Sequence, residues 1–468
     1  MRKRTSFSLN GCATGASAFV KNKIAHTLAS SNLWSVTENN SNNSWNVNFN
    51  NGNTNNNNKN NSNVGRAVSA LGEEEWEGWI EAADDCCRNK KTGLHCTEYR
   101  IREESLVGFV ECVANRTYIP LVSKCFVVKK PKLREVFAAH FLDRIVQHWI
   151  ILRLEPLLEQ HFVECGDVSF NCRKGYGTLR AVRYLEEGMK KISCGYTKSA
   201  WVGKFDLQSF FMSIDKDTLW DMLREFIEDN YHDTDKDTLL FLADTTIKHR
   251  PQDNCIRKGD LSLWDKLPKH KSLFTMDGMA IGNITSQILA NFYLSSFDKW
   301  ANGRCKSLGG CYVRFVDDMV MVLPKKEDVL SIYRDAKMFV HEKLGLTFHP
   351  DKVYIQHIAK GVKFVGSVIK PNRVYLSNRT IGSMYEMLAS MERHCKRLAT
   401  NSKPTEEMMA EVEHDICSCN SYMGFLIHHN TYAIRRKMFV RMKWFWRVSV
   451  MDGHYSKVVI KNKYKMFN

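Results

Sequence analysis

The sequence contains no apolar run long enough to span a membrane, which takes about 20 consecutive apolar residues. Its 15 cysteines lack a repeated Cys-x-x-Cys pattern, which excludes a small scaffold held together by disulfides or zinc. Residues 2–4 are basic, but the stretch that follows them is too short and polar for a secretory signal. We therefore expect a cytoplasmic protein with reduced thiols, including those in the one local group of possible metal ligands, Cys86, Cys87, His95 and Cys96.

Acidic residues are scarce near the C-terminus. Residues 431–468 contain ten lysines and arginines but a single acid, Asp452, and the whole chain has a formal net charge of +16. This excess favours a polyanionic partner, of which nucleic acid is the simplest, although charge alone does not identify it. With 468 residues, 44% hydrophobic and 25% charged, the chain has the composition of a globular protein with two to four packed units.

Aliphatic residues are scarce in the first 70 positions, where asparagine dominates. Sixteen of the 25 residues in 39–63 are asparagine. Such a segment buries too little apolar surface to offset the entropy lost on folding, so we predict that residues 1–72 are disordered. Well-patterned sequence begins at residue 73, where Trp76, Trp79 and Ile80 have helical spacing.

Strand and helix patterns alternate in the middle of the chain. Residues 201–206 (WVGKFD) predict a strand that ends in an acid, and residues 312–323 predict two apolar strands around an Asp-Asp pair. Between them, Asp215 is the expected N-cap of a helix. An apolar stripe follows it: Leu219, Met222, Leu223, Phe226 and Ile227. Gly345 is the expected C-cap of a later helix.

The order of these patterns predicts the fold class. Residues 230–275 are polar and look like an insertion, and residues 360–377 predict a hairpin. The order strand, helix, helix, strand, strand, helix, strand predicts an α+β fold in which helices cover an antiparallel, ferredoxin-like sheet.

Three carboxylates are expected to meet at the ends of these strands. Asp206 ends the first strand, and Asp317 and Asp318 interrupt an apolar stretch, where adjacent negative charges are costly unless a cation offsets them. A surface turn is the alternative for the pair. Carboxylates bind Mg²⁺ well, and two such ions can activate an attacking hydroxyl and stabilise a departing pyrophosphate. The pattern therefore predicts nucleotidyl transfer.

These residues belong to ordered motifs, between residues 129 and 366, that resemble the reverse transcriptase family. The FVDD box at residues 315–318 is a variant of the family's YxDD box. The other motifs are KPKLREVF, NCRKGYGT, FDLQSFF, GMAIGNITSQ, KLGLTFHPDKVYI and KFVGSVI. The resemblance implies a right-hand polymerase, with N-terminal helices and fingers in 73–200, a palm in 201–375 and a basic helical thumb in 376–468.

The resemblance also implies roles for matched residues. Asp206, Asp317 and Asp318 would hold two Mg²⁺ ions, together with the backbone carbonyl of Leu207. Phe211 would stack under the incoming sugar and exclude a 2′-hydroxyl by its bulk, unless it is a core residue. Further contacts to the dNTP are expected from Lys132, Arg134, Ile281, Gly282, Gln287 and Lys352.

For three of these residues the side-chain chemistry explains the expected contact. The guanidinium of Arg134 suits phosphate oxygens, Gly282 has no Cβ to keep the backbone from a base pair, and Lys352 would neutralise pyrophosphate. Template or primer contacts are implied for Arg173, Lys174, Gly361, Phe364, Gly366, Arg435, Arg436 and Lys437. The C-terminal cations alternate with aromatic residues, as suits a grip on a duplex. Solvated surface charge is the alternative for the cations.

The combination of IGNxTSQ, REVFAA and CRKGYGT resembles the reverse transcriptases of diversity-generating retroelements, within the group II intron-like bacterial and phage enzymes. Such enzymes copy a template RNA with errors opposite adenine, and the altered cDNA replaces a variable region of a target gene. Ile281 stands where many polymerases of this group have a glutamine. Fewer polar restraints on the nascent base pair would then lower fidelity.

The asparagine-rich segment fits this resemblance. Asparagine codons begin with two adenines, so adenine-directed errors change them strongly and create no stop codon. Residues 34–71 resemble a translated template repeat, which would overlap the start of this reading frame. A low-complexity tail that aids solubility is the alternative.

The resemblance implies a structured template RNA, a cDNA/RNA hybrid, dNTPs and a small basic oligomeric accessory protein as partners. Two other functions stay open. One is a group II intron-like or phage-defence reverse transcriptase that makes ordinary cDNA. The other is a non-catalytic RNA-binding scaffold, which is disfavoured because all three aspartates are present.

Overall fold

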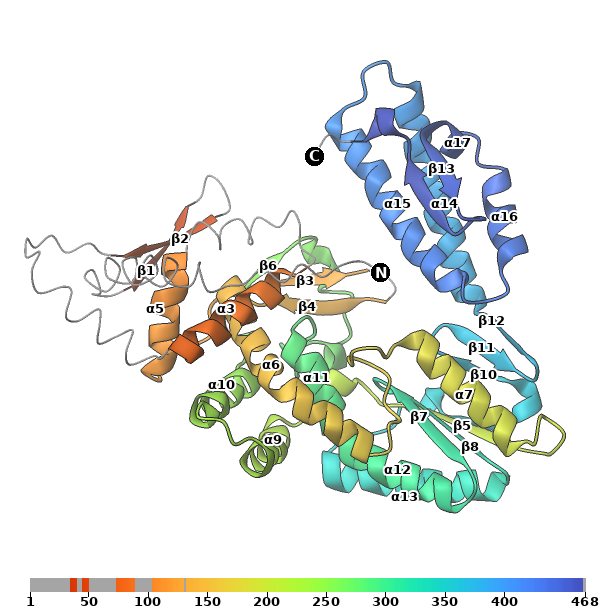
Figure 1. Cartoon of the computed structure of the whole chain (residues 1–468), viewed down its shortest axis with the longest axis horizontal. Helices are drawn as coiled ribbons and strands as arrows, with labels where there is room; N and C mark the ends of the chain where they lie inside the picture. The colour runs from red at the N-terminus through yellow and green to blue at the C-terminus, as the bar shows by residue number, and fades with distance from the viewer. Residues whose placement is uncertain (1–33, 40–43, 50–72, 89–102, 130–131, 466–468) are drawn as a thin grey trace, which may run out of the picture. The chain divides into compact units, whose positions relative to one another are not determined.

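The computed structural model describes residues 34–39, 44–49, 73–88, 103–129 and 132–465 (Figure 1). The chain divides into two compact units, Met1–His161 with Ser209–Tyr293 and Phe162–Gln208 with Leu294–Asn468. Within the described ranges, every helix is too short or too polar to cross a bilayer.

Two short strands lie inside the asparagine-rich segment. β1 (Trp34–Asn39) and β2 (Ser44–Phe49) pair antiparallel, with Trp34 opposite Phe49. The rest of residues 1–72 lies outside the described residues. The predicted disorder of this segment therefore stays a prediction.

The first unit packs helices against a three-stranded sheet. β3 (Ser123–Val128) and β4 (Arg134–Ala138) are antiparallel, and β6 (Cys255–Lys258) pairs with β3 in parallel. The helices of this unit include α3 (Glu73–Cys87), α5 (Glu103–Ala114), α6 (Phe141–Glu164), α8 (Phe210–Ser213), α9 (Lys216–Asn230), α10 (Lys236–Lys248) and α11 (Ile284–Tyr293). The polar segment 230–275 supplies α10 and β6, so it takes part in the sheet of this unit.

Helix α9 begins where the sequence predicts. The side chain of Asp215 accepts a hydrogen bond from the backbone N–H of Thr218 at 2.7 Å, which makes it the N-cap. The expected stripe faces inward, since Leu219, Leu223 and Ile227 are fully buried. The periodicity of apolar residues was a sufficient signal for this helix.

The second unit is built on a four-stranded antiparallel sheet with the strand order β7-β8-β5-β9. Its strands are β5 (Trp201–Asp206), β7 (Cys311–Phe315), β8 (Asp318–Leu323) and β9 (Tyr354–His357). Helix α7 (Thr178–Ile192) packs on the face that carries Val202 and Val320. Helices α12 (Ser295–Ser307) and α13 (Lys326–Leu344) lie on the opposite side (Figure 1). This agrees with the predicted α+β class.

The segment after the four-stranded sheet corrects one prediction. Residues 360–377 form three antiparallel strands rather than one hairpin: β10 (Val362–Phe364), β11 (Ser367–Lys370) and β12 (Arg373–Leu376). The two tight turns between them use positive φ angles at Gly366 and Asn372, residue types that tolerate this conformation. Gly345 ends α13 in the left-handed conformation, as predicted.

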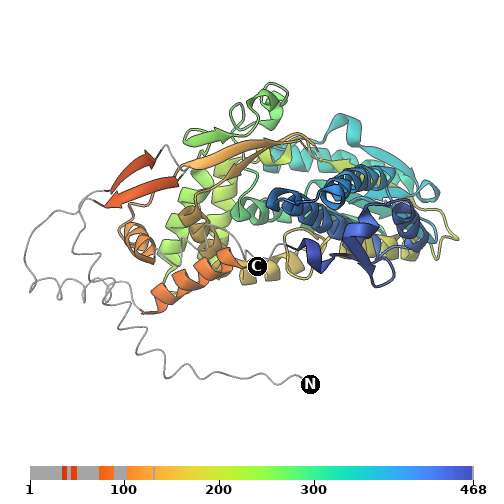
Figure 2. The same ribbon diagram turned by 90° about the horizontal axis from the view of Figure 1, so that it is seen from above.

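The C-terminal part of the second unit is mainly helical. α14 (Asn378–Thr400) and α15 (Glu406–Leu426) lie side by side in both views (Figures 1 and 2). They are followed by α16 (Tyr432–Val440), α17 (Phe445–Val448) and the hairpin of β13 (Ser449–Asp452) and β14 (Lys457–Ile460). Methionines, leucines and valines fill most of their common core, together with cysteines and phenylalanines such as Cys419, Phe439 and Phe445.

Candidate active site

Strand register brings the three predicted aspartates together at one end of the two central strands of the four-stranded sheet. Asp206, the last residue of β5, is the direct partner of Asp318, the first residue of β8. Asp317 lies in the turn between β7 and β8, and its carbonyl accepts a hydrogen bond from the N–H of Leu207 at 3.4 Å. Asp206 and Asp318 therefore face each other across one pair of strands, with Asp317 next to them.

The turn that carries Asp317 has an unusual backbone. Val316 has a φ of 58°, a conformation that is costly for a β-branched residue. Its N–H donates to Oδ1 of Asn171 at 2.8 Å, and its carbonyl accepts from Nη1 of Arg314 at 3.1 Å. The motif NCRKGYGT thus supports the turn that carries Asp317 directly through its first residue.

Arg314 is itself fixed by a buried carboxylate on α12. Its Nε and Nη2 donate to the two oxygens of Asp298 at 2.7 and 2.5 Å, and Tyr312 donates to the same carboxylate at 3.0 Å. Arg314 is fully buried and Asp298 nearly so. Neither residue is among those predicted from the sequence. An arginine inside the apolar stretch YVRFV was the available signal, because a buried guanidinium requires a buried partner.

Two lysines pair with the aspartates. Nζ of Lys204, on β5, donates to Oδ2 of Asp318 at 2.9 Å, and Lys352 forms an ion pair with Asp206. Burial is the main reason that the pKa of the Asp318 carboxyl is raised to about 6; Lys204 opposes this shift, and Asp317 and Asp206 add to it. The site therefore carries concentrated negative charge that cations offset only in part.

The donor set fits a divalent metal ion. Oδ1 of Asp318 is buried and has no hydrogen-bond partner among the described residues, so one hard oxygen is left for a ligand. In the part of the chain that the structure describes, no three His, Cys, Asp or Glu side chains are already arranged as a metal site. The aspartates converge, but the lysines hold two of them in ion pairs.

The segment with the predicted nucleotide contacts is packed on β4 in the first unit. The N–H of Phe137 donates to the carbonyl of Ile281 at 2.8 Å. A Cβ on Gly282 would lie 2.3 Å from the carbonyl oxygen of Phe137, and one on Gly278 would lie 2.2 Å from that of Phe211. Glycine is therefore required here by contacts within the chain, whereas the approach of Gly282 to a base pair stays a prediction.

The side chains predicted to touch the nucleotide differ in exposure. Arg134 and Lys132 are exposed near the start of β4, and Gln287 is exposed on α11. Phe211 is half-buried and stacks at a tilt on Phe210. Ile281 is also half-buried and packs against the apolar cluster around Phe137. Leu207 is buried and pairs with Phe348 in an isolated bridge.

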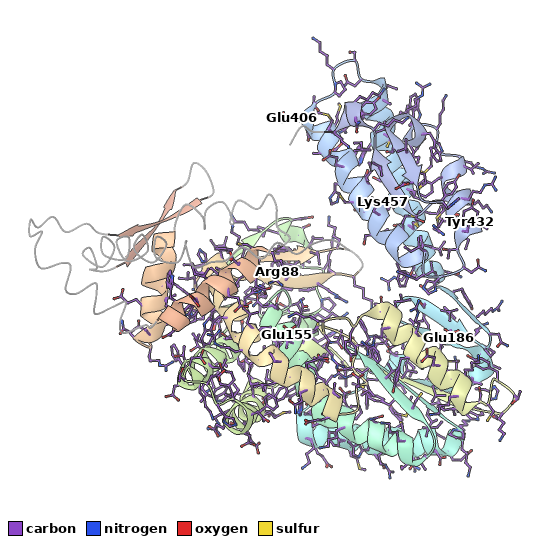
Figure 3. The ribbon with its side chains drawn as sticks, viewed as in Figure 1. Arg88, Glu155, Glu186, Glu406, Tyr432 and Lys457 are labelled. Atoms are coloured by element: carbon purple, nitrogen blue, oxygen red, sulfur yellow. The ribbon has the colours of Figure 1, made fainter. Side chains whose placement is uncertain are left out.

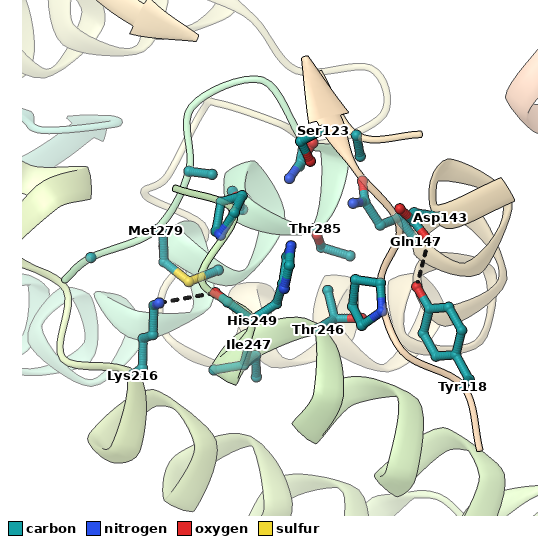
Figure 4. A pocket seen from close by; sticks show the side chains of 17 residues that line it. Tyr118, Ser123, Asp143, Gln147, Lys216, Thr246, Ile247, His249, Met279 and Thr285 are labelled. Atoms are coloured by element: carbon teal, nitrogen blue, oxygen red, sulfur yellow. Dashed lines mark hydrogen bonds between the residues drawn. The ribbon is translucent and has the colours of Figure 1, made fainter. Parts of the chain in front are cut away.

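This segment lines one side of a small cavity whose walls mix polar and apolar groups (Figure 4). Its lining includes Met279 and Thr285 from the nucleotide-side segment and His249, whose ring points into the cavity. On one side, Tyr118 donates to Asp143 at 2.9 Å. On another, Nζ of Lys216 donates to the carbonyl of His249 at 3.0 Å. Burial lowers the pKa of His249 to about 4.

Several residues predicted to contact template or primer have internal partners. Arg173 is buried and donates to the carbonyl of Ser169 at 2.7 Å and to Asp167 at 2.9 Å. Phe364 is fully buried in the core of the second unit. Arg435 is buried and donates to the carbonyl of Tyr455. Contacts of these residues with nucleic acid stay predictions, and their partners favour structural roles.

The remaining predicted contacts are glycines or exposed cations. A Cβ on Gly361 would lie 2.5 Å from the carbonyl oxygen of Ile369, so this glycine permits close packing of β10 on β11, and Gly366 turns with a φ of 86°. Lys174 is exposed, as are Arg436 and Lys437 on α16. Figure 3 shows the side chains that project from this part of the chain, with Tyr432 and Lys457 labelled.

The sequence of the chain is similar to a known protein family and to known proteins. The family model described as reverse transcriptase (RNA-dependent DNA polymerase) matches residues 127–369. Protein YkfC of Escherichia coli (strain K12) is 25% identical over 299 residues, which cover 57% of this chain and 69% of YkfC. The group II intron-encoded protein LtrA of Lactococcus lactis subsp. cremoris is 22% identical over 371 residues, which cover 64% of this chain and 57% of LtrA.

The chain thus spans little more than half the length of LtrA. Among solved structures, apo telomerase from Candida Tropicalis is similar at 11% identity and a TM-score of 0.43, over 73% of this chain and 64% of that chain.

Proposed function

The chain belongs to the reverse transcriptase family, and we propose that it is an RNA-directed DNA polymerase that extends a primer along an RNA template. The observation that carries this proposal is the pairing of Asp206 with Asp318 across β5 and β8, with Asp317 in the adjoining turn. Carboxylates gathered at one place suit nucleotidyl transfer, because the reaction needs positioned charge and no covalent nucleophile.

The three aspartates would hold two Mg²⁺ ions, with the carbonyl of Leu207 as a further ligand. When bound, the ions supply activation of the primer hydroxyl and stabilisation of charge on the phosphates. Lys352, beside Asp206, would neutralise the departing pyrophosphate. Arg134 and Lys132 are exposed, as contact with a triphosphate requires.

The proposal assigns the remaining residues by their places in the motifs. Phe211 follows Asp206 by five residues and would select against a 2′-hydroxyl. Ile281 and Gly282 would face the nascent base pair, and Gln287 would contribute from α11. The four-stranded sheet would be the palm and the helices after residue 376 the thumb, where Arg436 and Lys437 would contact the nucleic acid backbone. Lys174, in the motif NCRKGYGT, would contact it from the fingers.

For the biological role we propose mutagenic copying of a template repeat, as in a diversity-generating retroelement. The motif IGNxTSQ and the 16 asparagines in residues 39–63 support this role. A structured template RNA and a small basic oligomeric accessory protein would be its partners. A second candidate is a group II intron-like enzyme that makes ordinary cDNA, which the similarity to LtrA favours.

Primer extension on RNA, followed by sequencing of the products, separates these candidates. The mutagenic role predicts errors concentrated at template adenines, and it predicts that Ile281→Gln reduces them. Accurate cDNA from the wild-type chain would favour the group II intron-like candidate. A chain that binds RNA but makes no DNA with Mg²⁺ would overturn the polymerase proposal and favour a binding scaffold.

A further inference from the structure

Lys204 lies inside the carboxylate site and was not among the residues assigned a role. It stands on β5 two residues before Asp206, and because side chains alternate along a strand, the two share a face of the sheet. Its Nζ donates to Oδ2 of Asp318 at 2.9 Å and to the backbone carbonyl of Lys363, on β10, at 2.6 Å. The ammonium group therefore bridges a predicted metal ligand and a neighbouring strand.

The two lysines of the site differ in their freedom. The side chain of Lys352 is 40% exposed, whereas that of Lys204 is only 15% exposed. Lys204 is confined by the strand that carries it, and both of its acceptors are fixed by β8 and β10. It cannot leave the site without breaking two charge-assisted hydrogen bonds, which are stronger than neutral ones.

A divalent ion at Asp318 would meet this ammonium group at close range. Two cations a few ångströms apart in a partly buried site repel each other strongly, because solvent screens them poorly. The carbonyl of Lys363 gives the ammonium a second acceptor, so Lys204 can give up Asp318 and stay hydrogen-bonded. Asp318 can therefore release the ammonium group of Lys204 and bind a metal ion instead. The binding free energy of the ion is reduced, however, because the ammonium group stays nearby.

We propose that Lys204 is an internal counter-cation that competes with a divalent ion for Asp318 and thereby weakens metal binding before nucleotide arrives. This inference rests on the proposed function, because it takes the three aspartates as metal ligands. A nucleoside triphosphate brings its own negative charge to the site and would offset the ammonium. Lys204 thus makes metal loading depend on nucleotide binding.

This competition is tested by titrating the full chain with Mn²⁺ in the absence of nucleotide and nucleic acid. Electron paramagnetic resonance measures the bound and free Mn²⁺. Lys204→Met removes the charge but keeps the side-chain length, and we expect it to tighten Mn²⁺ binding about tenfold, or ~1.4 kcal/mol. Lys204→Arg keeps the charge and should bind Mn²⁺ as weakly as the wild type. Lys325→Met is the matched control, because this exposed lysine lies beyond the opposite end of β8 and its loss changes the net charge equally.

Asp317→Asn, made in the wild-type and Lys204→Met chains, distinguishes a failure of this inference from a failure of the proposed function. Asp317-dependent binding that is tighter in Lys204→Met than in the wild type supports the inference. Equal or weaker binding in Lys204→Met overturns the inference alone. Binding that is independent of Asp317 in both chains overturns the metal site and the proposed function with it. Thermal unfolding in EDTA checks that each variant folds, and Lys204→Gln replaces Lys204→Met if the latter unfolds at a lower temperature.

Discussion

At the scale of single residues, Asn171 and Arg314 hold the turn that presents Asp317. Val316 adopts a positive φ, and its N–H and carbonyl are both satisfied by these two side chains. Backbone strain of this kind costs about 1–3 kcal/mol and persists only when neighbours fix it. In the proposed function, Asn171 and Arg314 would therefore be positioning residues, which act on catalysis through this turn.

Removing the Asn171 amide should loosen this turn. We expect Asn171→Ala to lower the free energy of unfolding by about 1–2 kcal/mol, because the N–H of Val316 loses its partner, and to slow DNA synthesis about tenfold. Val316→Gly in the same chain should restore part of both, since glycine adopts positive φ without strain. Urea denaturation and primer extension measure the two effects. An Asn171→Ala chain with wild-type stability and rate would contradict the assignment.

Asp143 gives a prediction about pH. This buried carboxyl on α6 accepts hydrogen bonds from Tyr118 at 2.9 Å and from the N–H of Leu121 at 3.0 Å. Burial raises its pKa to about 7 from an ordinary value of 3.8. Between these values the folded chain keeps a proton that the unfolded chain loses, so this group lowers the free energy of unfolding as pH rises through that window.

Asp143→Asn removes the titration but keeps the shape of the side chain. We expect the stability of the wild type relative to Asp143→Asn to decrease steadily from about pH 4 to about pH 7 and to level off above it. Urea denaturation of both chains across this range measures the difference. A difference that does not vary with pH would show that the carboxyl is ionised in the folded chain.

The site residues that could be predicted stand out in the local sequence, whereas those that could not are defined by partners far away in the sequence. Asp206, Asp317 and Asp318 could be found because a charged residue in an apolar strand is a local anomaly. Arg314 is an anomaly of the same kind and could have been found, but its partner Asp298 and the support of Val316 by Asn171 could not, because each of these partners lies on another part of the fold. Pairing across elements follows from tertiary packing, which local pattern does not encode.

At the scale of elements, β4 and the nucleotide-side segment form one packed arrangement. Gly282 has a φ of 129°, and a Cβ there would lie 2.3 Å from the carbonyl oxygen of Phe137. We expect Gly282→Ala to lower the free energy of unfolding by about 1–3 kcal/mol, because it adds a clash to an unfavourable backbone conformation.

Gly303→Ala is the matched control for this substitution. Gly303 lies in helix α12, where an added Cβ would meet no described atom within 4 Å. Alanine there should raise the free energy of unfolding by roughly 0.5–1 kcal/mol, because it restricts the unfolded chain and favours the helix. Equal effects of the two substitutions in urea denaturation would contradict the packing of Gly282 on β4.

Helices and strands were predictable where the residues that determine them are close together in the sequence. The N-cap Asp215 and the C-cap Gly345 were predicted, because capping depends on residues within one turn of a helix. The parallel pairing of β6 with β3 was not, because it joins residues about 130 positions apart. Residues 360–377 were predicted as one hairpin, although Gly366 and Asn372 each provide a turn and the segment has three strands.

At the scale of the whole molecule, the chain's two compact units are discontinuous in sequence. The chain passes between the units at three places, and one of them lies between Gln208 and Ser209, two residues after Asp206. The resemblance to reverse transcriptases implies fingers in 73–200, a palm in 201–375 and a thumb in 376–468, and this division stays a prediction. A unit assembled from two separated stretches is visible only once tertiary packing is known. The three aspartates nevertheless belong to the same unit.

In the proposed function, Asp206, Asp317 and Asp318 at the ends of β5 and β8 catalyse DNA synthesis. Primer extension on an RNA template with dNTPs and Mg²⁺, by the wild type and by Asp317→Asn, tests it most directly, with circular dichroism and thermal unfolding as the check on folding. We predict extension by the wild type and a loss of about a thousandfold or more in the variant, because several kcal/mol of charge stabilisation depend on this ligand. Wild-type extension by a folded Asp317→Asn chain would contradict the account.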